Sequence, residues 1–571
     1  MHSARQPIAY QHNPVRTLSA ATLTLLAVSA CRCGGANSSQ SGPAVSRSTR
    51  AFEQPKTEGS NDSSPADPWV PGDPGATDLR FDINPQLQPR PISPLIYGIN
   101  SDLRDFREQR WGVIRAGGNR ATAYNWENNA SNAGSDYLFQ NDGLASQSDA
   151  PAEPLLKLID AAASISAAVI MTISNADYVA ADKNGGGDVR RSGADYLRTR
   201  FKANHPRKGS AFAALPDPSD AHVYQDEFVA FLKAQRPNTK LVLSMDNEPE
   251  LWSQTHAEIF RSAVTYADLW RRNHAYARAA KDVWPGIEVL GFVSFGYSGY
   301  IDLQKARDAD GRSFIDWYLD QARAAERAEG SRLIDYLDLH WYPEAQGGGE
   351  RVTGTNTASA VVSAREQAPR SLWDPSYSET SWIRDKHGGP IDLLHWLQAK
   401  IARHYPGTKL AFTEWNYGAG NHISGAIAVA DVLGIFGKYG VSLASYWPLI
   451  DAEPYAYAAF RAYRNYDGQG SGFGDTSVAA ISSDVEAATV YASIQSDHPE
   501  RLVIVAINKD TTMKHAGFRI SYGTAYTKAA MFVLTGAQPV LTQANALRAV
   551  AMNAFRYEMP AQSICVVIPQ Q

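Results

Sequence analysis

The chain of 571 residues contains only three cysteines, Cys31, Cys33 and Cys565. So few thiols exclude a disulfide-stabilised scaffold, because such a scaffold needs several cysteine pairs. The sequence also lacks a long hydrophobic run, since the apolar stretch from Leu18 to Ala30 is too short to cross a bilayer as a permanent helix. The composition is otherwise that of ordinary globular proteins, with 44% hydrophobic and 20% charged residues. We therefore expect a soluble protein built around a hydrophobic core.

Basic residues are not in excess, because 54 Lys and Arg face 59 Asp and Glu, and they are scattered along the chain. A nucleic-acid partner would require clustered positive charge, so we expect none. No nucleophile elbow, phosphate-binding loop or metal-ligand spacing is present, and the glycine triplets 185–187 and 347–349 lack the helix signature of a phosphate loop. We expect no required cofactor, although the sequence leaves room for a structural cation.

Amphipathic aromatic residues are abundant, with 13 Trp and 27 Tyr against 19 Phe. Their rings offer a flat apolar face and a polar edge, which suits the stacking of sugars. Aromatic residues in the core of a large protein would give the same composition. Composition alone therefore leaves both interpretations open.

The first residues are typical of an export signal, because Arg16 precedes the apolar stretch and small residues lead to Cys31. The string Val-Ser-Ala-Cys that ends at Cys31 resembles a bacterial lipobox, in which the cysteine is lipidated; cleavage as an ordinary signal peptide is the alternative. We expect an exported protein, either secreted or held at the cell surface as a lipoprotein. Residues 1–31 are the predicted signal, and the Ser, Pro and Gly-rich residues 32–76 are a predicted disordered tether.

Residues 95–465 alternate short apolar segments with stretches of helical periodicity. Eight such apolar segments predict a closed α/β barrel of the (β/α)8, or TIM, type, with a doubly wound open sheet as the alternative. The predicted strands are Leu95–Asn100, Gly112–Ala116, Ala168–Ser174, Leu241–Met245, Ile287–Val293, Leu333–Trp341, Leu410–Trp415 and Leu443–Leu449. The predicted helices are Glu153–Ile165, His222–Ala234, Tyr266–Val283, Phe314–Ala328, Ile391–His404 and Gly425–Tyr439.

Residues 466–571 follow a different pattern, with short runs that alternate polar and apolar residues. This pattern predicts an all-β sandwich after the barrel. Residues 77–94 also alternate around Phe81, so we expect them to contribute one or more strands to the sandwich.

Two acidic residues end predicted barrel strands. Glu248 follows the fourth strand in the string Asp246-Asn-Glu-Pro, and Glu414 lies near the end of the seventh. Active sites of such barrels lie at the carboxyl ends of the strands, and glycoside hydrolysis needs two carboxyl groups that flank the scissile bond. Asn247 is placed to contact a sugar 2-hydroxyl. The alternative, helix capping or a loop ion pair, would explain one acid more easily than a matched pair.

Four motifs extend this pattern: Tyr124-Asn-Trp-Glu-Asn128, Asp246-Asn-Glu-Pro-Glu-Leu-Trp-Ser-Gln-Thr-His256, Asp338-Leu-His-Trp-Tyr-Pro343 and Thr413-Glu-Trp-Asn-Tyr-Gly418. Together they resemble glycoside hydrolase family 44, a clan A family of endoglucanases and xyloglucanases built as a barrel plus a β-sandwich. The resemblance implies that Glu248 is the acid/base and Glu414 the nucleophile of a retaining enzyme. In the last 90 or so residues the resemblance is one of architecture only.

The resemblance and the positions of residues at strand ends suggest further substrate-binding residues. Arg115 would orient the nucleophile or form a structural ion pair. Either His340 or Tyr342 would touch the nucleophile, with a role in the core or at the rim of the barrel as the alternative. The aromatic residues that could stack sugars, or simply pack, are Trp126, Trp341, Trp382, Trp415 and Trp447.

We therefore expect a retaining, endo-acting hydrolase of β-1,4-glucans such as cellulose derivatives, mixed-linkage glucan or xyloglucan. A monomer that binds a polysaccharide is the expected state. The alternatives are another clan A activity, such as a β-mannanase or xylanase, and a non-catalytic glycan-binding surface lipoprotein.

Overall fold

The computed structural model describes residues 70–100, 110–450 and 452–571. The predicted export signal, Cys31 and most of the predicted tether lie outside this part of the chain. Within it, no helix combines the length and apolarity needed to cross a membrane. Cys565 is buried and is not in a disulfide.

Eight parallel strands close a barrel, in which the last strand pairs with the first. The predicted (β/α)8 barrel is therefore confirmed, and the open sheet is excluded. Side chains of every strand are largely buried, because helices cover the outside and side chains fill the inside. The barrel strands are β3 (Gly98–Asn100), β4 (Val113–Ala116), β7 (Ala168–Ile173), β11 (Leu241–Met245), β12 (Glu288–Ser294), β13 (Tyr336–Trp341), β16 (Lys409–Trp415) and β17 (Leu443–Tyr446).

The helices around the barrel begin and end close to the predicted positions. One prediction needs correction, because residues 222–224 form a short strand and the helix begins at Gln225. The larger helices are α2 (Glu153–Ser164), α4 (Gln225–Gln235), α6 (Tyr266–Val283), α8 (Phe314–Glu329), α11 (Leu393–His404), α12 (Ile423–Tyr439) and α13 (Pro454–Arg464). Shorter ones are α3 (Tyr196–Thr199), α5 (Trp252–Thr255), α7 (Tyr297–Asp302), α9 (Ser359–Gln367) and α10 (Trp382–His387).

Long connections follow several strands at the carboxyl end of the barrel. The connection after β7 contains a small sheet of β8 (Tyr178–Ala180), β9 (Phe201–His205) and β10 (His222–Tyr224). The connection after β13 contains the hairpin of β14 (Gln346–Gly347) and β15 (Glu350–Arg351), followed by α9 and α10. Short strands β5 (Ser131–Asn132) and β6 (Asn141–Asp142) pair after β4. These connections surround the end of the barrel at which the predicted acids lie.

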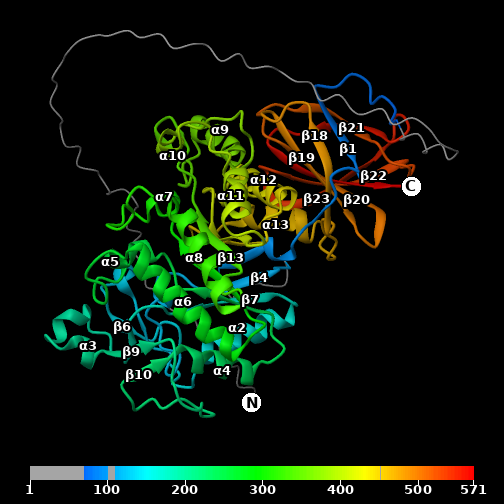
Figure 1. Cartoon of the computed structure of the whole chain (residues 1–571). Coiled ribbons are helices and arrows are strands. Elements are labelled where there is room, and N and C mark those ends of the chain that lie inside the picture. The colour runs from blue at the N-terminus through cyan, green and yellow to red at the C-terminus, as the bar shows by residue number, and fades with distance from the viewer. Residues whose placement is uncertain (1–69, 101–109, 451) are drawn as a thin grey trace, which may run out of the picture. The chain divides into compact units, whose positions relative to one another are not determined.

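The second part of the fold is a β-sandwich with its own hydrophobic core. Its first strand, β1, comes from before the barrel and lies between β18 and β21, so both ends of the described chain meet there (Figure 1). Strand β23 exposes most of its side chains, so burial imposes little alternation of polar and apolar residues on it. The strands are β1 (Leu79–Asn84), β2 (Arg90–Pro91), β18 (Thr476–Ser482), β19 (Ala488–Gln495), β20 (His498–Asn508), β21 (Lys514–Ile520), β22 (Lys528–Thr535), β23 (Gln538–Arg548), β24 (Ala554–Met559) and β25 (Ser563–Gln570).

Helix α12 joins the two parts, because it packs between the barrel and the sandwich and is buried on nearly every side. Asp431 of α12 forms a buried ion pair with Lys509, at 2.6 Å between Oδ2 and Nζ. The hydroxyl groups of Thr489 and Tyr491 of β19 also donate to Asp431. A carboxylate of the barrel helix is therefore bonded entirely by donors of the sandwich.

We expect Lys509→Met to lower the free energy of unfolding by about 3–5 kcal/mol, because it leaves the Asp431 carboxylate buried without its counter-charge. Urea denaturation followed by tryptophan fluorescence measures the change. The matched control is Lys514→Met, which breaks a more exposed pair with Asp510 and should cost at most about 1 kcal/mol. Equal losses in the two variants would contradict a special contribution of the buried pair.

Candidate active site

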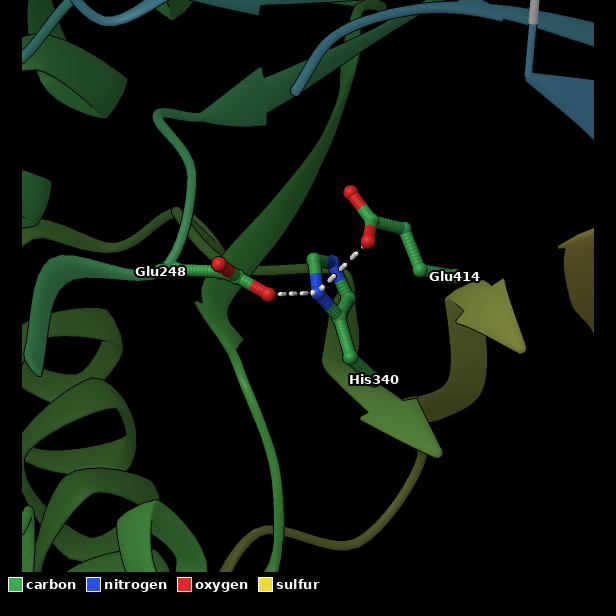
Figure 2. Close-up of side chains that lie close together, drawn as sticks. All are labelled: Glu248, His340 and Glu414. Carbon is green, nitrogen blue, oxygen red and sulfur yellow. Dashed lines mark hydrogen bonds and ion pairs between the residues drawn. The ribbon is translucent and has the colours of Figure 1, made fainter. Parts of the chain in front are cut away.

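Glu248 and Glu414 face each other across the carboxyl end of the barrel. Glu248 lies three residues beyond β11, and Glu414 is the penultimate residue of β16. One oxygen of each carboxyl group and one ring nitrogen of His340 all lie within 4.8 Å of one another. Figure 2 shows the imidazole ring of His340 between the two carboxyl groups. Carboxyl oxygens this close are compatible with the short carboxyl spacing, about 5–5.5 Å, of double displacement at a glycosidic bond.

A β-bulge in β16 aims Glu414 into the barrel. The pairing of β13 and β16 shifts after Leu339, so that His340 pairs with Glu414 rather than with Thr413. Thr413 faces the interior, where its hydroxyl group contacts Asp338. Simple alternation along the strand would therefore direct Glu414 outward, and the extra residue reverses this direction.

Three side chains fix the Glu414 carboxylate. The Arg115 guanidinium donates to Oε1 at 2.7 Å, and the Tyr342 hydroxyl donates to Oε2 at 2.9 Å. The nearer nitrogen of His340 lies 3.4 Å from Oε2. Arg115 is fully buried and compensates the negative charge, so the ion pair combines charge with direction. Glu414 is held as an oriented carboxylate.

Glu248 has a different environment. Its backbone is in the left-handed region, with φ of +43°, and its N–H group donates to the Val293 carbonyl at 2.9 Å. Desolvation by the surrounding protein raises the pKa of Glu248 to about 7; the positive charge of Arg115 opposes this increase and the negative charge of Asp136 adds to it. Near neutral pH a large fraction of Glu248 therefore carries a proton. Two glutamates at one site are thus prepared for opposite roles.

His340 lies between the two acids and is uncharged. Burial lowers the pKa of its imidazole to about 3, more than the nearby Glu414 carboxylate raises it. Its Nδ1 atom lies 2.9 Å from Oε1 of Glu248, and the hydroxyl group of Tyr300 donates to its backbone carbonyl. A neutral imidazole has one donor and one acceptor nitrogen, so it can hydrogen-bond a carboxyl group without competing for its charge.

Asn247 and Asp246 form hydrogen bonds that fix the backbone between β11 and Glu248. Arg115 donates to the side-chain oxygen of Asn247 at 2.7 Å, so one guanidinium orients both Asn247 and Glu414. The Asp246 carboxylate accepts bonds from the Thr122 hydroxyl and from the backbone N–H groups of Asn175 and Asn247. Asp246 therefore stabilises the turn that carries Glu248.

The chain is similar to several known proteins. The model of glycoside hydrolase family 44 matches residues 130–345. Endoglucanase A of Paenibacillus lautus is 40% identical over 86% of this chain and 72% of its own length. A family 44 xyloglucanase of Paenibacillus polymyxa, solved with xyloglucan, is 37% identical, with a TM-score of 0.83 over 86% of this chain and 99% of that one. A family 44 endoglucanase of Clostridium thermocellum is 39% identical, with a TM-score of 0.82 over 87% and 100%.

The chain belongs to glycoside hydrolase family 44. The resemblance predicted from the four motifs is therefore confirmed, and the chain is an endo-acting glycoside hydrolase. The structural likeness to the family 44 enzymes extends well beyond the stretch that the family model matches.

Of the five tryptophans that could stack sugars or simply pack, three are part of the core of this family 44 enzyme, so the packing alternative describes them. Trp126 packs on Phe228 with 1% of its surface exposed. Trp341 and Trp415 are also buried; Trp415 contacts Phe436 of α12 on the outside of the barrel. A ring enclosed by protein presents no face to a sugar.

The other two tryptophans keep exposed surface. Trp382, at the start of α10, is 42% exposed and packs edge-on against Tyr297. Trp447 follows β17, is partly exposed and lies so close to Gly118 that a Cβ atom there would be 2.7 Å from its ring. These two rings are the remaining candidates for sugar stacking.

Two buried polar residues of the site were not predicted from the sequence. Asn100, the last residue of β3, accepts a bond from Arg115 at 2.8 Å and donates to the Thr413 carbonyl. Asp338 lies within β13 and accepts bonds from the N–H and hydroxyl groups of Thr413; burial raises its pKa to about 7. A polar residue inside an otherwise apolar strand was the available signal for both.

Proposed function

We propose that this chain is a retaining endo-β-1,4-glucanase in which Glu414 is the nucleophile and Glu248 the acid/base. The observation that carries the proposal is the pair of carboxyl groups, which lie in contrasting environments with one oxygen of each within 4.8 Å of the other. One is paired with Arg115, and the other has a pKa raised to about 7.

In the first step, an oxygen of Glu414 attacks the anomeric carbon while Glu248 donates its proton to the leaving glycosidic oxygen. The bond from the anomeric carbon to the leaving oxygen breaks, and an ester bond to Glu414 forms with inverted configuration. In the second step, Glu248, now ionised, takes a proton from water, and the water oxygen displaces Glu414 with a second inversion. The product keeps the β configuration. Because two carboxyl groups supply both the nucleophile and the proton, we propose that no cofactor is needed.

The neighbouring side chains have distinct roles in this mechanism. Arg115 and Tyr342 hold the Glu414 carboxylate in the attacking position. Neutral His340 contacts Glu248 and leaves its proton available for transfer. Asn247, with its oxygen bonded to Arg115, has its amide N–H groups free to donate to the sugar 2-hydroxyl, where contacts strengthen in the transition state.

We propose xyloglucan as the preferred polymer, supported by the family 44 xyloglucanase solved with that substrate. Trp382 and Trp447 would supply the stacking surfaces. The decisive experiment follows product sizes and anomeric configuration by NMR on xyloglucan, carboxymethyl-cellulose and mannan, with wild type and Glu248→Gln. We expect β-configured oligosaccharides from xyloglucan and their loss in the variant. Faster cleavage of mannan, or initial α products, would overturn the proposal.

A polymer outside the cell requires an exported enzyme, so we also propose export directed by residues 1–31, a lipid anchor at Cys31 and a monomeric enzyme. Mass spectrometry of the N-terminal peptide of the exported protein tests the anchor, and an unmodified or absent Cys31 would contradict it. Light scattering tests the monomer.

The pH dependence of kcat/KM should report the raised pKa of Glu248. Glu248 must be protonated in the first step, so activity should fall about tenfold per pH unit above a pKa of about 7. Asp136→Asn removes a negative charge that raises this pKa, so the decline should begin at lower pH. Asp310→Asn, at an exposed position, is the control. An unchanged profile in Asp136→Asn would contradict the assignment.

A further inference from the structure

Arg365 of α9 is fully buried, and its guanidinium contacts only neutral groups. The Nε atom donates to the carbonyls of Val352 and Tyr417, at 2.9 and 3.2 Å. The Nη2 atom donates to the carbonyls of Gly354 and Asn356, and Nη1 donates to the Ser424 hydroxyl. Among the described residues, no carboxylate lies within 4 Å of this guanidinium, whereas Arg115 has Glu414 as its counter-ion.

A buried charge without a counter-ion is costly. Burial lowers the pKa of Arg365 to about 10, although the negative charge of the neighbouring Glu366 opposes the change, so the guanidinium still carries its charge at neutral pH. A neutral side chain of similar length would avoid this cost if Arg365 only filled space. The arginine is therefore explained by its several N–H donors, which hydrogen-bond several chain segments at once.

These segments belong to two active-site connections. Residues 352–356 follow the hairpin β14–β15 in the connection after β13, and Tyr417 follows β16. The two segments touch directly: the Ala419 N–H group donates to the Gly354 carbonyl, and a Cβ atom at Gly418 would lie 2.5 Å from the Val352 carbonyl oxygen. Arg365 thus joins the connections of the two strands that carry His340 and Glu414.

Further bonds link each segment to the site. Arg351, next to Val352, donates to the backbone carbonyls of Tyr342 and Pro343. On the other side, the Trp341 indole N–H donates to the Tyr417 hydroxyl at 3.0 Å. The backbone of Tyr342 and the side chain of Trp341 are therefore linked to the two segments that Arg365 bonds.

We propose that Arg365 is a positioning residue for hydrolysis: it fixes the connections after β13 and β16 so that the Tyr342 hydroxyl stays hydrogen-bonded to Glu414. This role rests on the proposed function of Glu414 as the nucleophile. Arg365 contacts neither carboxyl group of the site and acts through Tyr342. A shift of about 1 Å between two reacting groups can cost about 100-fold in rate, so the expected effect is large.

The test is a double-mutant cycle that measures kcat and KM separately on xyloglucan for Arg365→Met, Tyr342→Phe and the double variant. We expect Arg365→Met to lower kcat about 10- to 100-fold with little change in KM. The double variant should be no less active than the less active of the two single variants, because both substitutions remove the same contact. If the fold-loss in kcat of the double variant equalled the product of the two single losses, the proposal would be overturned. Arg365→Lys keeps the charge without the fan of donors, and it should lose kcat similarly if Arg365→Met does not fold.

Arg332→Met is the matched control. Arg332 donates to the Thr408 hydroxyl and the Pro406 carbonyl, and so links the same two strands, β13 and β16, at their opposite ends. We expect Arg332→Met to lower the melting temperature. At temperatures at which this variant is still folded, its kcat should equal that of wild type. Equal kcat losses in Arg332→Met and Arg365→Met, or unchanged kcat in the latter, would reduce Arg365 to a purely structural role. Normal activity of Glu414→Ala would instead refute the underlying assignment of the nucleophile.

Discussion

Replacing Glu414 with alanine is expected to lower kcat on xyloglucan by at least about 10⁴-fold, on the order of 5 kcal/mol in activation free energy. In the proposed mechanism the substitution removes the atom that forms the covalent intermediate, and Glu248 cannot replace it, because Glu248 lies on the side of the leaving group. Initial rates with the purified variant measure the loss. Residual activity within about tenfold of wild type would contradict the assignment.

The same substitution has a structural cost. Glu414 is the counter-ion of the fully buried Arg115, so Glu414→Ala should also lower the free energy of unfolding by about 3–5 kcal/mol. Glu414→Gln keeps the volume and an acceptor for Arg115, so it should be nearly as inactive and more stable. An activity loss that followed stability across these two variants would indicate a folding defect rather than lost chemistry.

Rescue by azide tests specifically whether Glu414 is the nucleophile. In Glu414→Ala the space on the α face of the sugar is open, so azide can attack the anomeric carbon of an aryl β-cellobioside there and displace the phenolate. The product should be the α-glycosyl azide. No azide adduct, or a β-configured one, would show that Glu414 does not occupy the nucleophile position.

The barrel was predictable because parallel strands buried on both faces read as continuous apolar runs. Strand β23 could not be predicted because it has little buried surface to impose a pattern. The positions of the two acids were predictable for a different reason, since the fold places the carboxyl ends of β11 and β16 at one mouth of the barrel.

The sequence could not decide which tryptophans pack in the core. His340 at the end of β13 and Tyr342 just beyond it face the interior of the barrel, so Trp341 between them faces the helices. On β16 the bulge after Leu339 of the partner strand turns Glu414 inward and Trp415 outward, and no sequence pattern indicates a bulge at Thr413. Bonds such as those of Arg365 join segments up to 59 residues apart in sequence, so only the folded chain brings them together.

Replacing Glu248 with alanine is expected to affect substrates according to their leaving groups. On xyloglucan the leaving sugar hydroxyl needs protonation, so kcat should fall about 10²- to 10⁴-fold. On 2,4-dinitrophenyl β-cellobioside the leaving group is stable as an anion, so the first step should remain fast. Release of water-derived product should be slow, because no base activates the water, and a burst of dinitrophenolate should precede a slow steady state. Equal losses on both substrates would contradict the acid/base role.

Azide should rescue Glu248→Ala with the opposite stereochemistry to that in Glu414→Ala. Here the glycosyl ester of Glu414 forms, and azide, which needs no base, attacks it from the β face to give the β-glycosyl azide. Glu250→Gln is the matched control, because burial raises the pKa of Glu250 to about 8, but its carboxyl group bonds Ser294 and the Phe295 N–H. If β-glycosyl azide formed in Glu250→Gln instead, Glu250 would be the acid/base. If it formed only in Glu248→Ala, proton transfer would be assigned to Glu248, the glutamate that contacts His340.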